Sequence, residues 1–285
     1  MFDDQKVADN IIKSFSENIG FPVYTAEELE KMYESFGVDP KSLDRRVFDT
    51  ESMSHHLQSE VIKLLGIMKI EKDDLILDAG CGNGAPTRLI AKLYGCQITG
   101  FDINPNQIEK AVDCDRLEGV DLLIKREIKD VHKLDYPDNT FNKIFHNETI
   151  CHWMNKEVAL SGLYRVLKKG GLMGFHDWVR GDRGDLNEAG GGFPGTYAEG
   201  VWFQHTIHET KRLLEQAGFV VLHAEDTTDN VDRGLHARLR ELRMSKVYTK
   251  GSTEEYFHKS LRYFQVMIET HYAFLRYGRF LCIKN

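Results

Sequence analysis

The chain has 285 residues, and its 37 Lys and Arg residues against 44 Asp and Glu residues give a formal net charge of −7. This acidic balance argues against a general nucleic-acid-binding protein, which needs an excess of cations to neutralise phosphates. With 41% hydrophobic residues, the chain is long enough to bury one large core with an added cap, and two independent enzymes are not expected.

The cysteines and the N-terminus bear on the cellular compartment. The five cysteines include no CxxC pair, which predicts a reduced protein without a disulfide framework or a zinc ribbon. The N-terminus is acidic and polar, unlike a signal peptide, and no uncharged apolar run reaches about 18 residues. We therefore expect a cytoplasmic protein without integral membrane association, and a homo-oligomer remains open.

The first 70 residues are predicted to form a helical N-terminal cap, because their apolar residues recur at helical spacing. Residues 71–285 are predicted to form the main domain, which carries a helical insertion at about 230–277. The helices expected in the cap are 7–15, 25–36 and 53–68.

From residue 71 onward, apolar strands and amphipathic helices alternate with short connections. This alternation predicts a mostly parallel sheet with helices on both faces, and so a doubly wound, Rossmann-like α/β fold. The seven expected strands are 74–79, 97–103, 121–128, 141–148, 172–179, 219–226 and 278–284. The expected helices between them are 85–94, 104–119, 156–171 and 206–218.

A segment at 180–204 interrupts the alternation. It is too rich in glycine for a helix and too long for an ordinary connection, so we expect a functional loop. Together with the N-terminal helices through residue 60, it is predicted to form a lid that shields a reactive site from water.

The strongest local motif is the segment Asp78–Gly84, with the sequence DAGCGNG, which we call the glycine loop. Glycines at a strand-to-helix turn let a ligand approach the backbone at the carboxyl edge of a sheet. Asp102 ends the next strand, where an acid can bind both hydroxyls of a ribose. A tight turn with an incidental acid is one alternative. A dinucleotide site is another, but its GxGxxG spacing would need glycine at Ala85.

The segments DAGCGNG, GFDI and RVLKKGG together resemble the motifs of class I S-adenosylmethionine-dependent methyltransferases, over residues of about 75–225. The resemblance implies S-adenosyl-L-methionine as the cofactor, with the glycine loop under its amino-acid end and Asp102 on its ribose. The cofactor-binding residues that the resemblance implies are Asp78, Gly80, Gly82, Gly84, Asp102, Ile103 against the adenine, Asp130 and Val131 near the adenine amino group, and Asn147. For Asp130, the alternative is an acidic loop residue that is exposed to solvent and binds no ligand.

Residues 80–111 and the segment NETICH at 147–152 carry a narrower resemblance. They are similar to the subgroup of sterol and prenyl-diphosphate C-methyltransferases, and they overlap with sarcosine/dimethylglycine N-methyltransferases. Ala85 stands where this subgroup usually has glycine, and the N-terminal aromatic motif of the sterol enzymes is not recognisable. Tyr33 resembles N-terminal tyrosines that close over the cofactor in relatives, and a buried core tyrosine is the alternative.

Glu148 and His152 are the candidate catalytic residues. Methyl transfer from a sulfonium is an in-line displacement, so a base is needed only where a proton must leave. The two residues lie four apart, which would place both on one face of a helix. A carboxylate there can stabilise a cationic centre and then take its proton. The alternative is that Glu148 caps a helix while His152 packs beneath it.

Aromatic residues that could stabilise a cation lie near this segment and in the Gly-rich loop. They suit either a carbocation or a quaternary ammonium group, and core packing is the alternative for each ring. The segment 176–185 contains one His and three Asp but matches no metal motif, so no metal is expected. The aromatic residues are Trp153, His176, Trp178, Phe193, Tyr197, Trp202 and Phe203.

The leading functional hypothesis is a methyltransferase that acts on a small molecule, with C-methylation of a prenyl-type alkene ahead of N-methylation of a small amine. A nicotinamide-dependent dehydrogenase and a cofactor-binding protein without catalysis are the competing hypotheses. We expect no nucleic-acid partner, because HNETICHW lacks the (N/D)PP(Y/F)-type tetrapeptide of base-methylating enzymes. Arginines after residue 230, if they line the substrate-binding pocket, would favour a substrate with a carboxylate or a diphosphate group.

Overall fold

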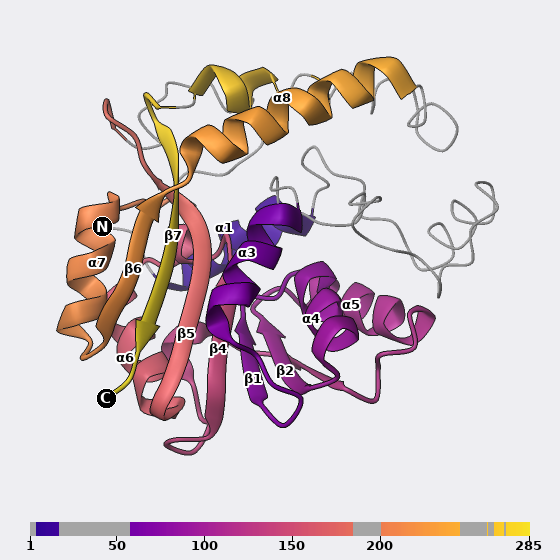
Figure 1. Cartoon of the computed structure of the whole chain (residues 1–285), viewed down its shortest axis with the longest axis vertical. Coiled ribbons are helices and arrows are strands. Elements are labelled where there is room, and N and C mark those ends of the chain that lie inside the picture. Colours follow the sequence, from indigo (N-terminus) through magenta and orange to yellow (C-terminus); the bar gives the residue numbers. More distant parts are fainter. Residues whose placement is uncertain (1–3, 17–57, 185–200, 246–260, 262–264, 271) are drawn as a thin grey trace.

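The computed structural model describes residues 4–16, 58–184, 201–245, 261, 265–270 and 272–285. These residues contain a seven-stranded sheet in the order β3-β2-β1-β4-β5-β7-β6 (Figure 1). Strands β1 to β5 are parallel, and β7 runs antiparallel to both β5 and β6. The predicted mostly parallel, seven-stranded α/β fold is therefore confirmed. The strands are β1 Leu75–Ala79, β2 Gln97–Asp102, β3 Ile124–Ile128, β4 Phe141–Asn147, β5 Leu167–Arg180, β6 Val220–Asp226 and β7 Leu275–Ile283.

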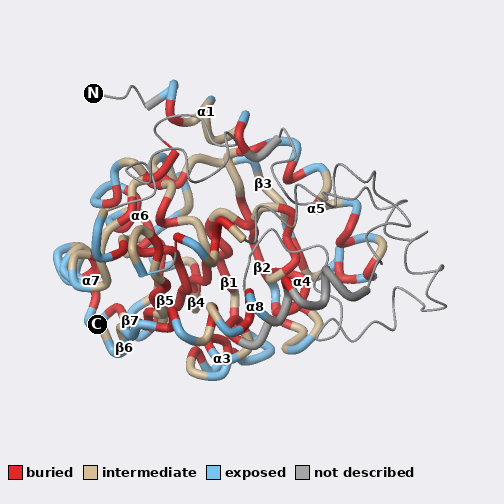
Figure 2. Tube along the Cα trace, turned by 90° about the horizontal axis from the view of Figure 1, so that it is seen from above, coloured by how far each residue is buried: buried red, intermediate tan, exposed pale blue. Residues whose placement is uncertain are grey.

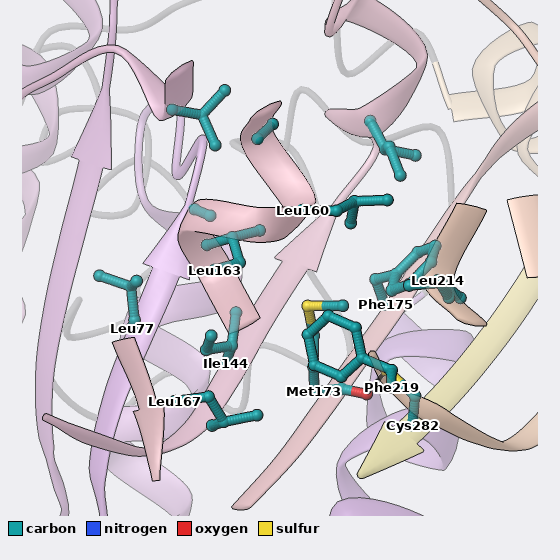
Figure 3. Packing of buried hydrophobic residues seen from close by; sticks show 14 of the residues in the cluster. Leu77, Ile144, Leu160, Leu163, Leu167, Met173, Phe175, Leu214, Phe219 and Cys282 are labelled. Carbon is teal, nitrogen blue, oxygen red and sulfur yellow. Dashed lines mark hydrogen bonds between the residues drawn. The ribbon is translucent and has the colours of Figure 1, made fainter. Parts of the chain in front are cut away.

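Helices cover both faces of the sheet. On one face, α6 and α7 pack against a core that includes Leu160, Leu163 and Leu214 (Figure 3). On the other face, α3 and α4 bury Leu64 and Ile90 against the same strands. The burial trace in Figure 2 accordingly shows buried segments concentrated in the strands between the two helical layers. The helices are α1 Asp4–Ser16, α3 Gln58–Met68, α4 Ala85–Tyr94, α5 Pro105–Leu117, α6 Lys156–Val166, α7 Ile207–Gln216 and α8 Thr228–Ser245.

Local sequence explains where the helices beside the glycine loop begin. Helix α4 starts after Gly84, which has a left-handed conformation, and it carries proline in its first turn. Helix α5 starts at Pro105, and the side chain of Asn104 caps it by accepting a hydrogen bond from the Asn106 amide. Both helices therefore begin at the carboxyl ends of strands β1 and β2.

The boundary between α6 and β5 differs from the prediction. The sequence predicts a helix over 156–171, but α6 ends at Val166 and β5 already begins at Leu167. Residues 167–171 pair with neighbouring strands instead: Leu167 lies opposite Phe141, and the Gly170 amide donates to the Lys284 carbonyl at 2.7 Å. Pairing with distant strands outweighs local helix propensity here, and Gly170 adopts the left-handed φ of 72°.

Helix α8 lies across the end of the sheet at which the parallel strands finish (Figure 1). A third buried cluster joins α8 to that end: Val231 and Leu235 of α8 pack with Trp178, Trp202 and Tyr277. Ile11 of α1 also packs against this cluster. Helical elements thus cover the edge where a ligand binds in sheets of this kind.

The division into a cap at 1–70 and a main domain at 71–285 stays a prediction. Most of the predicted lid, at 185–200 and 17–57, lies outside the described residues, as do Tyr33, Phe193 and Tyr197. Among the residues that are described, no helix is long and apolar enough to cross a membrane.

Candidate active site

The glycine loop leaves β1 at its carboxyl end and is fixed to the end of β2. The amides of Gly80 and Cys81 both donate to the Phe101 carbonyl at 2.9 Å. Gly80, Gly82 and Gly84 have φ values of 78°, 52° and 82°. Residues other than glycine rarely adopt this left-handed backbone conformation. The backbone path of the loop therefore requires the three glycines that the sequence supplies.

Asp102 lies at the carboxyl end of β2 and holds the middle of the glycine loop. Its Oδ2 accepts a hydrogen bond from the Gly82 amide at 2.9 Å, and its Oδ1 accepts one from the Asn104 amide at 2.9 Å. Burial raises the pKa of this carboxyl group, while the amide hydrogen bonds oppose that rise. Each carboxylate oxygen retains capacity for a further hydrogen bond, such as one from a ribose hydroxyl.

Asp78 supports the glycine loop from within the protein. It is 2% exposed, and its Oδ2 accepts a hydrogen bond from the Thr87 hydroxyl at 2.5 Å. Burial raises the pKa of Asp78 to about 6, against the opposing effects of Thr87 and Arg126. The side chain therefore joins the start of the loop to the first turn of α4.

The predicted adenine-binding residues lie next to Asp102. The Lys129 amide donates to the Asp102 carbonyl at 3.0 Å, which brings the end of β3 beside the end of β2. Asp130 then caps a short 3-10 helix, η2 (Val131–Lys133), by accepting a hydrogen bond from the His132 amide at 2.9 Å. Its carboxylate also lies 2.7 Å from His132 Nδ1, and this interaction lowers the pKa of Asp130.

Val131 is buried at this edge, whereas Ile103, directly after Asp102, is partly exposed. An apolar side chain and a carboxylate side by side match the flat face and the amino group of an adenine.

Glu148 follows β4, the strand next to β1. Its backbone adopts a left-handed φ of 55°, and its amide donates to the His176 carbonyl at 2.9 Å. Its carboxylate accepts a hydrogen bond from the indole nitrogen of Trp178. The strained backbone and the indole together aim one carboxylate at the carboxyl edge of the sheet. Asn147, the last residue of β4, is partly exposed at the same edge.

Thr149 joins the Glu148 segment to the glycine loop, and sequence reasoning missed it. Its hydroxyl donates to the Ala79 carbonyl at 3.2 Å. A Cβ atom on Gly80 would lie 2.5 Å from Thr149 Cγ2, so only glycine fits at that position. Glu148 and the glycine loop are thereby held next to each other, although no motif in the sequence indicates the contact.

Asp177 fixes the turn after Glu148. Its fully buried carboxylate accepts hydrogen bonds from the amides of Thr149, Ile150 and Cys151 at 2.7, 2.9 and 3.3 Å. Burial by itself would raise the pKa of Asp177, but His146, the Cys151 thiol and the Thr149 amide outweigh it and hold the pKa below its usual value. Among the described residues, no group of three or more His, Cys, Asp or Glu gathers to hold a metal ion.

The expectation that Glu148 and His152 lie on one face of a helix is wrong. Only Ile150–His152 form a short 3-10 helix, η3, and Glu148 lies outside it with a left-handed backbone. The amides of residues 149–151 donate to the Asp177 carboxylate instead of to the backbone carbonyls of an α-helix. His152 Nδ1 lies 2.8 Å from the Val201 carbonyl, and burial lowers the pKa of its imidazole.

Hydrogen bonds connect the segment 201–205 to η3 and to the start of α6. The Phe203 amide donates to the Cys151 carbonyl at 2.7 Å. The buried ammonium group of Lys156 donates to the Trp153 carbonyl at 2.8 Å and to the Phe203 carbonyl. Burial lowers the pKa of Lys156 to about 8. Lys156 is part of no recognisable sequence motif, so the sequence alone does not predict that it connects residues 153 and 203.

The predicted aromatic residues separate into groups. Trp178 and Trp202 stack with ring centroids 4.8 Å apart and an angle of 8° between the rings, and His152 lies 4.6 Å from the Trp202 ring. This stack is beside Glu148. Trp153 belongs to the core on the α6 face, and His176 Nε2 lies 2.7 Å from the Thr227 hydroxyl.

Comparison with known proteins bears on the family and the fold of the chain. Residues 77–175, which span the glycine loop, Asp102 and Glu148, match the family described as methyltransferase domain. Residues 77–175 thus form a methyltransferase domain. The resemblance noted from the sequence is thereby confirmed.

The methyltransferase domain is homologous to curated sterol 24-C-methyltransferases. The enzyme of Saccharomyces cerevisiae is 34% identical over 174 residues, which cover 57% of this chain and 43% of the yeast protein. The chain spans about half the length of the curated relatives that it matches.

Solved structures share the fold at low sequence identity. Phosphoethanolamine N-methyltransferase 2 of Haemonchus contortus matches with a TM-score of 0.75 and 17% identity, over 96% of this chain and 60% of that one. Geranyl diphosphate C-methyltransferase of Streptomyces coelicolor matches with a TM-score of 0.69 and 12% identity, over 100% of both chains. The methyltransferase domain thus has the fold of both N- and C-methyltransferases.

Proposed function

We propose that this protein is an S-adenosylmethionine-dependent C-methyltransferase whose acceptor is an alkene carbon of a prenyl- or sterol-type small molecule. The observation that carries the proposal is the carboxylate of Glu148, presented beside the glycine loop by Thr149 and Trp178. Homology to sterol 24-C-methyltransferases supports carbon as the acceptor atom.

The residues present fit the cofactor. The three glycines of the glycine loop leave its backbone open to a ligand, Asp102 offers a carboxylate for ribose hydroxyls, and Asp130 with Val131 offers a polar and an apolar group for adenine. When bound, S-adenosyl-L-methionine supplies an electrophilic methyl group on its sulfonium. The buried apolar cluster around Trp178 and Trp202 lies beside this edge of the sheet, where it would shield one side of a bound cofactor from water.

The role that we assign to Glu148 follows from the chemistry of alkene methylation. Addition of a methyl group to an alkene leaves a carbocation, which must lose a proton from a neighbouring carbon to give the product. A nearby carboxylate stabilises that charge and then accepts the proton. The hydrogen bond from Trp178 holds the carboxylate in one orientation during both steps.

The aromatic pair beside Glu148 supports a cationic intermediate. Trp178 meets the carboxylate through its indole N–H and stacks on Trp202, and an aromatic face stabilises a desolvated cation by roughly 0.5 to 2 kcal/mol. The same pair suits the ammonium product of a small amine, so N-methylation is the second candidate function. Hydride transfer is not favoured, because residues 77–175 match a methyltransferase family.

An assay with a labelled methyl donor tests the proposal. The purified protein is incubated with methyl-labelled S-adenosyl-L-methionine and separately with prenyl diphosphates, sterols that carry a side-chain alkene, and small amines. We expect label on a carbon of one alkene acceptor, located by mass spectrometry and NMR. Label transferred only to amines would overturn the assignment of carbon as the acceptor atom, and failure to bind S-adenosylhomocysteine would overturn the assignment of the cofactor.

A further inference from the structure

A buried arginine reaches the glycine loop from two strands away. Arg126 lies on β3, where it pairs in register with Gly100 of β2. Its side chain is 2% exposed, so a guanidinium group is enclosed next to the predicted cofactor site. None of the chemistry proposed for the active site uses this group.

Two sets of hydrogen bonds fix the guanidinium group. Its Nε and Nη2 donate to the two carboxylate oxygens of Asp115 at 2.8 and 2.9 Å, which is a bidentate arrangement. Its Nη1 donates to the Thr87 hydroxyl at 3.0 Å, and that hydroxyl donates to Asp78 at 2.5 Å. A continuous chain of polar contacts therefore runs from Asp115 on α5 to the first residue of the glycine loop.

Two glycines make room for the same guanidinium group. A Cβ atom on Gly84, the last residue of the glycine loop, would lie 2.2 Å from Arg126 Nη2. A Cβ atom on Gly100 would lie 2.5 Å from Arg126 Nη1 and 3.2 Å from Cys81 Sγ. Real Cβ atoms do not approach so closely, so the flat guanidinium occupies the space that two missing side chains leave.

The charges around Arg126 suit a cation at this position. Asp115 is the direct partner of Arg126. The positive charge of Arg126 also acts on Asp78, Asp102 and the Cys81 thiol. The positive charge opposes the rise that burial causes in the pKa of Asp78 and of Asp102. A second arginine, Arg88, lies 3.6 Å from Asp115, so Asp115 keeps a cationic neighbour if Arg126 is replaced.

We propose that Arg126 is a positioning residue for cofactor binding, and that its guanidinium, wedged between Gly84 and Gly100, holds the glycine loop in its binding conformation. Arg126 acts through the loop backbone and through Thr87 and Asp78 rather than by touching the ligand. The inference rests on the proposed function only in the choice of S-adenosylhomocysteine as the probe.

Replacement of the arginine tests the positioning role. In Arg126→Met the loop loses its support, and we expect S-adenosylhomocysteine to bind about tenfold or more weakly by calorimetry. We expect KM for S-adenosyl-L-methionine to rise in parallel, while kcat at saturation stays within about threefold, because Glu148 and Trp178 are untouched. Arg126→Lys keeps the charge without the bidentate fork and should recover part of the affinity.

Arg279→Met is the matched control. Arg279 is also a mostly buried arginine, paired with Glu60 at 3.2 Å, but it lies on β7 away from the glycine loop. It should leave the affinity for S-adenosylhomocysteine unchanged. Wild-type affinity in Arg126→Met would overturn the proposal, as would an equal loss of affinity in Arg279→Met.

Gly100 provides a second test that keeps the charge in place. Gly100 has no left-handed φ, and the nearest atoms that an alanine Cβ would meet there belong to the guanidinium and Cys81. Gly100→Ala should weaken binding of S-adenosylhomocysteine and lower the melting temperature, and both effects should shrink when Arg126 is already Met. Equal costs of Gly100→Ala in the two backgrounds would show that no wedge exists, even if Arg126→Met alone folds poorly.

The two proposals fail in different ways. A wild-type protein that does not bind S-adenosylhomocysteine overturns the proposed function, whereas the melting temperatures of the Gly100 and Arg126 variants still test the wedge. A wild-type protein that binds, with variants that bind equally well, overturns the wedge alone.

Discussion

The indole nitrogen of Trp178 on β5 donates a hydrogen bond to the carboxylate of Glu148, which follows β4. The bond joins the ends of two neighbouring strands across the edge of the sheet at which the glycine loop lies. A donor aimed at a carboxylate favours its charged form and fixes its direction. Glu148 is thus oriented by a side chain 30 residues further along the chain.

Glu148→Gln should lower turnover without affecting cofactor binding. The glutamine keeps the shape and can still accept the hydrogen bond from Trp178, but it cannot accept a proton. A general base typically contributes about 10²- to 10⁴-fold to the rate, so we expect a loss of that size in kcat with an alkene acceptor. Calorimetry with S-adenosylhomocysteine provides the control. A variant that loses affinity but keeps its turnover per bound cofactor would make Glu148 structural.

Trp178→Phe should lower turnover by a smaller factor. Phenylalanine preserves an aromatic ring against Trp202 but removes the donor to Glu148. A hydrogen bond to a charged group is worth roughly 1.5 to 3 kcal/mol, and only part of it acts on the reaction, so kcat should fall by about tenfold. Combination with Glu148→Gln should cost little more than Glu148→Gln alone, because both changes act on one carboxylate. If the losses in kcat of the two single variants add up in the double variant, Trp178 does not act through the Glu148 carboxylate.

Asp102→Ala should weaken cofactor binding. The change removes the carboxylate proposed for the ribose and also the acceptor of the Gly82 amide. We expect a loss on the order of 1.5 to 3 kcal/mol in the affinity for S-adenosylhomocysteine, measured by calorimetry. Binding of a nicotinamide dinucleotide by the wild-type protein, without binding of S-adenosylhomocysteine, would contradict the assignment.

The strands and the glycine loop could be predicted because their signals are local. Apolar runs bounded by turn residues mark all seven strands, and the left-handed φ values at Gly80, Gly82 and Gly84 explain why glycine recurs there. Homology to methyltransferases confirms the family that these residues indicate. The start of β5 was missed because Leu167 and Gly170 are held by strands distant in sequence.

The supports of the site could not be predicted, because each depends on residues distant in sequence. Asp177 binds the Thr149 amide across 28 positions, and Arg126 reaches Thr87 across 39. Periodicity and motif spacing carry no information about such pairs. The four-residue spacing of Glu148 and His152 was misleading, because the Asp177 carboxylate makes the chain turn tightly after β4.

Asp78 should make the stability of the protein fall as pH rises from about 4 to about 6. Burial raises its pKa to about 6 in the folded protein, whereas the carboxyl group of an unfolded chain titrates near 3.9. Between these values the folded state holds a proton that the unfolded state has released, so rising pH favours unfolding. Above about pH 6 both states are ionised, and the loss of stability is complete.

Asp78→Asn removes this titration and leaves an oxygen that can accept the hydrogen bond from Thr87. The free energy of unfolding, from urea titrations at a series of pH values, should therefore rise in the variant relative to the wild type as pH goes from 4 to 7. A raised pKa of this size corresponds to an upper bound of about 3 kcal/mol. Groups that do not interact with Asp78 titrate alike in both proteins and cancel in the difference, whereas Asp102 interacts with Asp78 and contributes to it. A difference that is flat across this range, or that falls with pH, would show that Asp78 is charged at no cost in the folded protein.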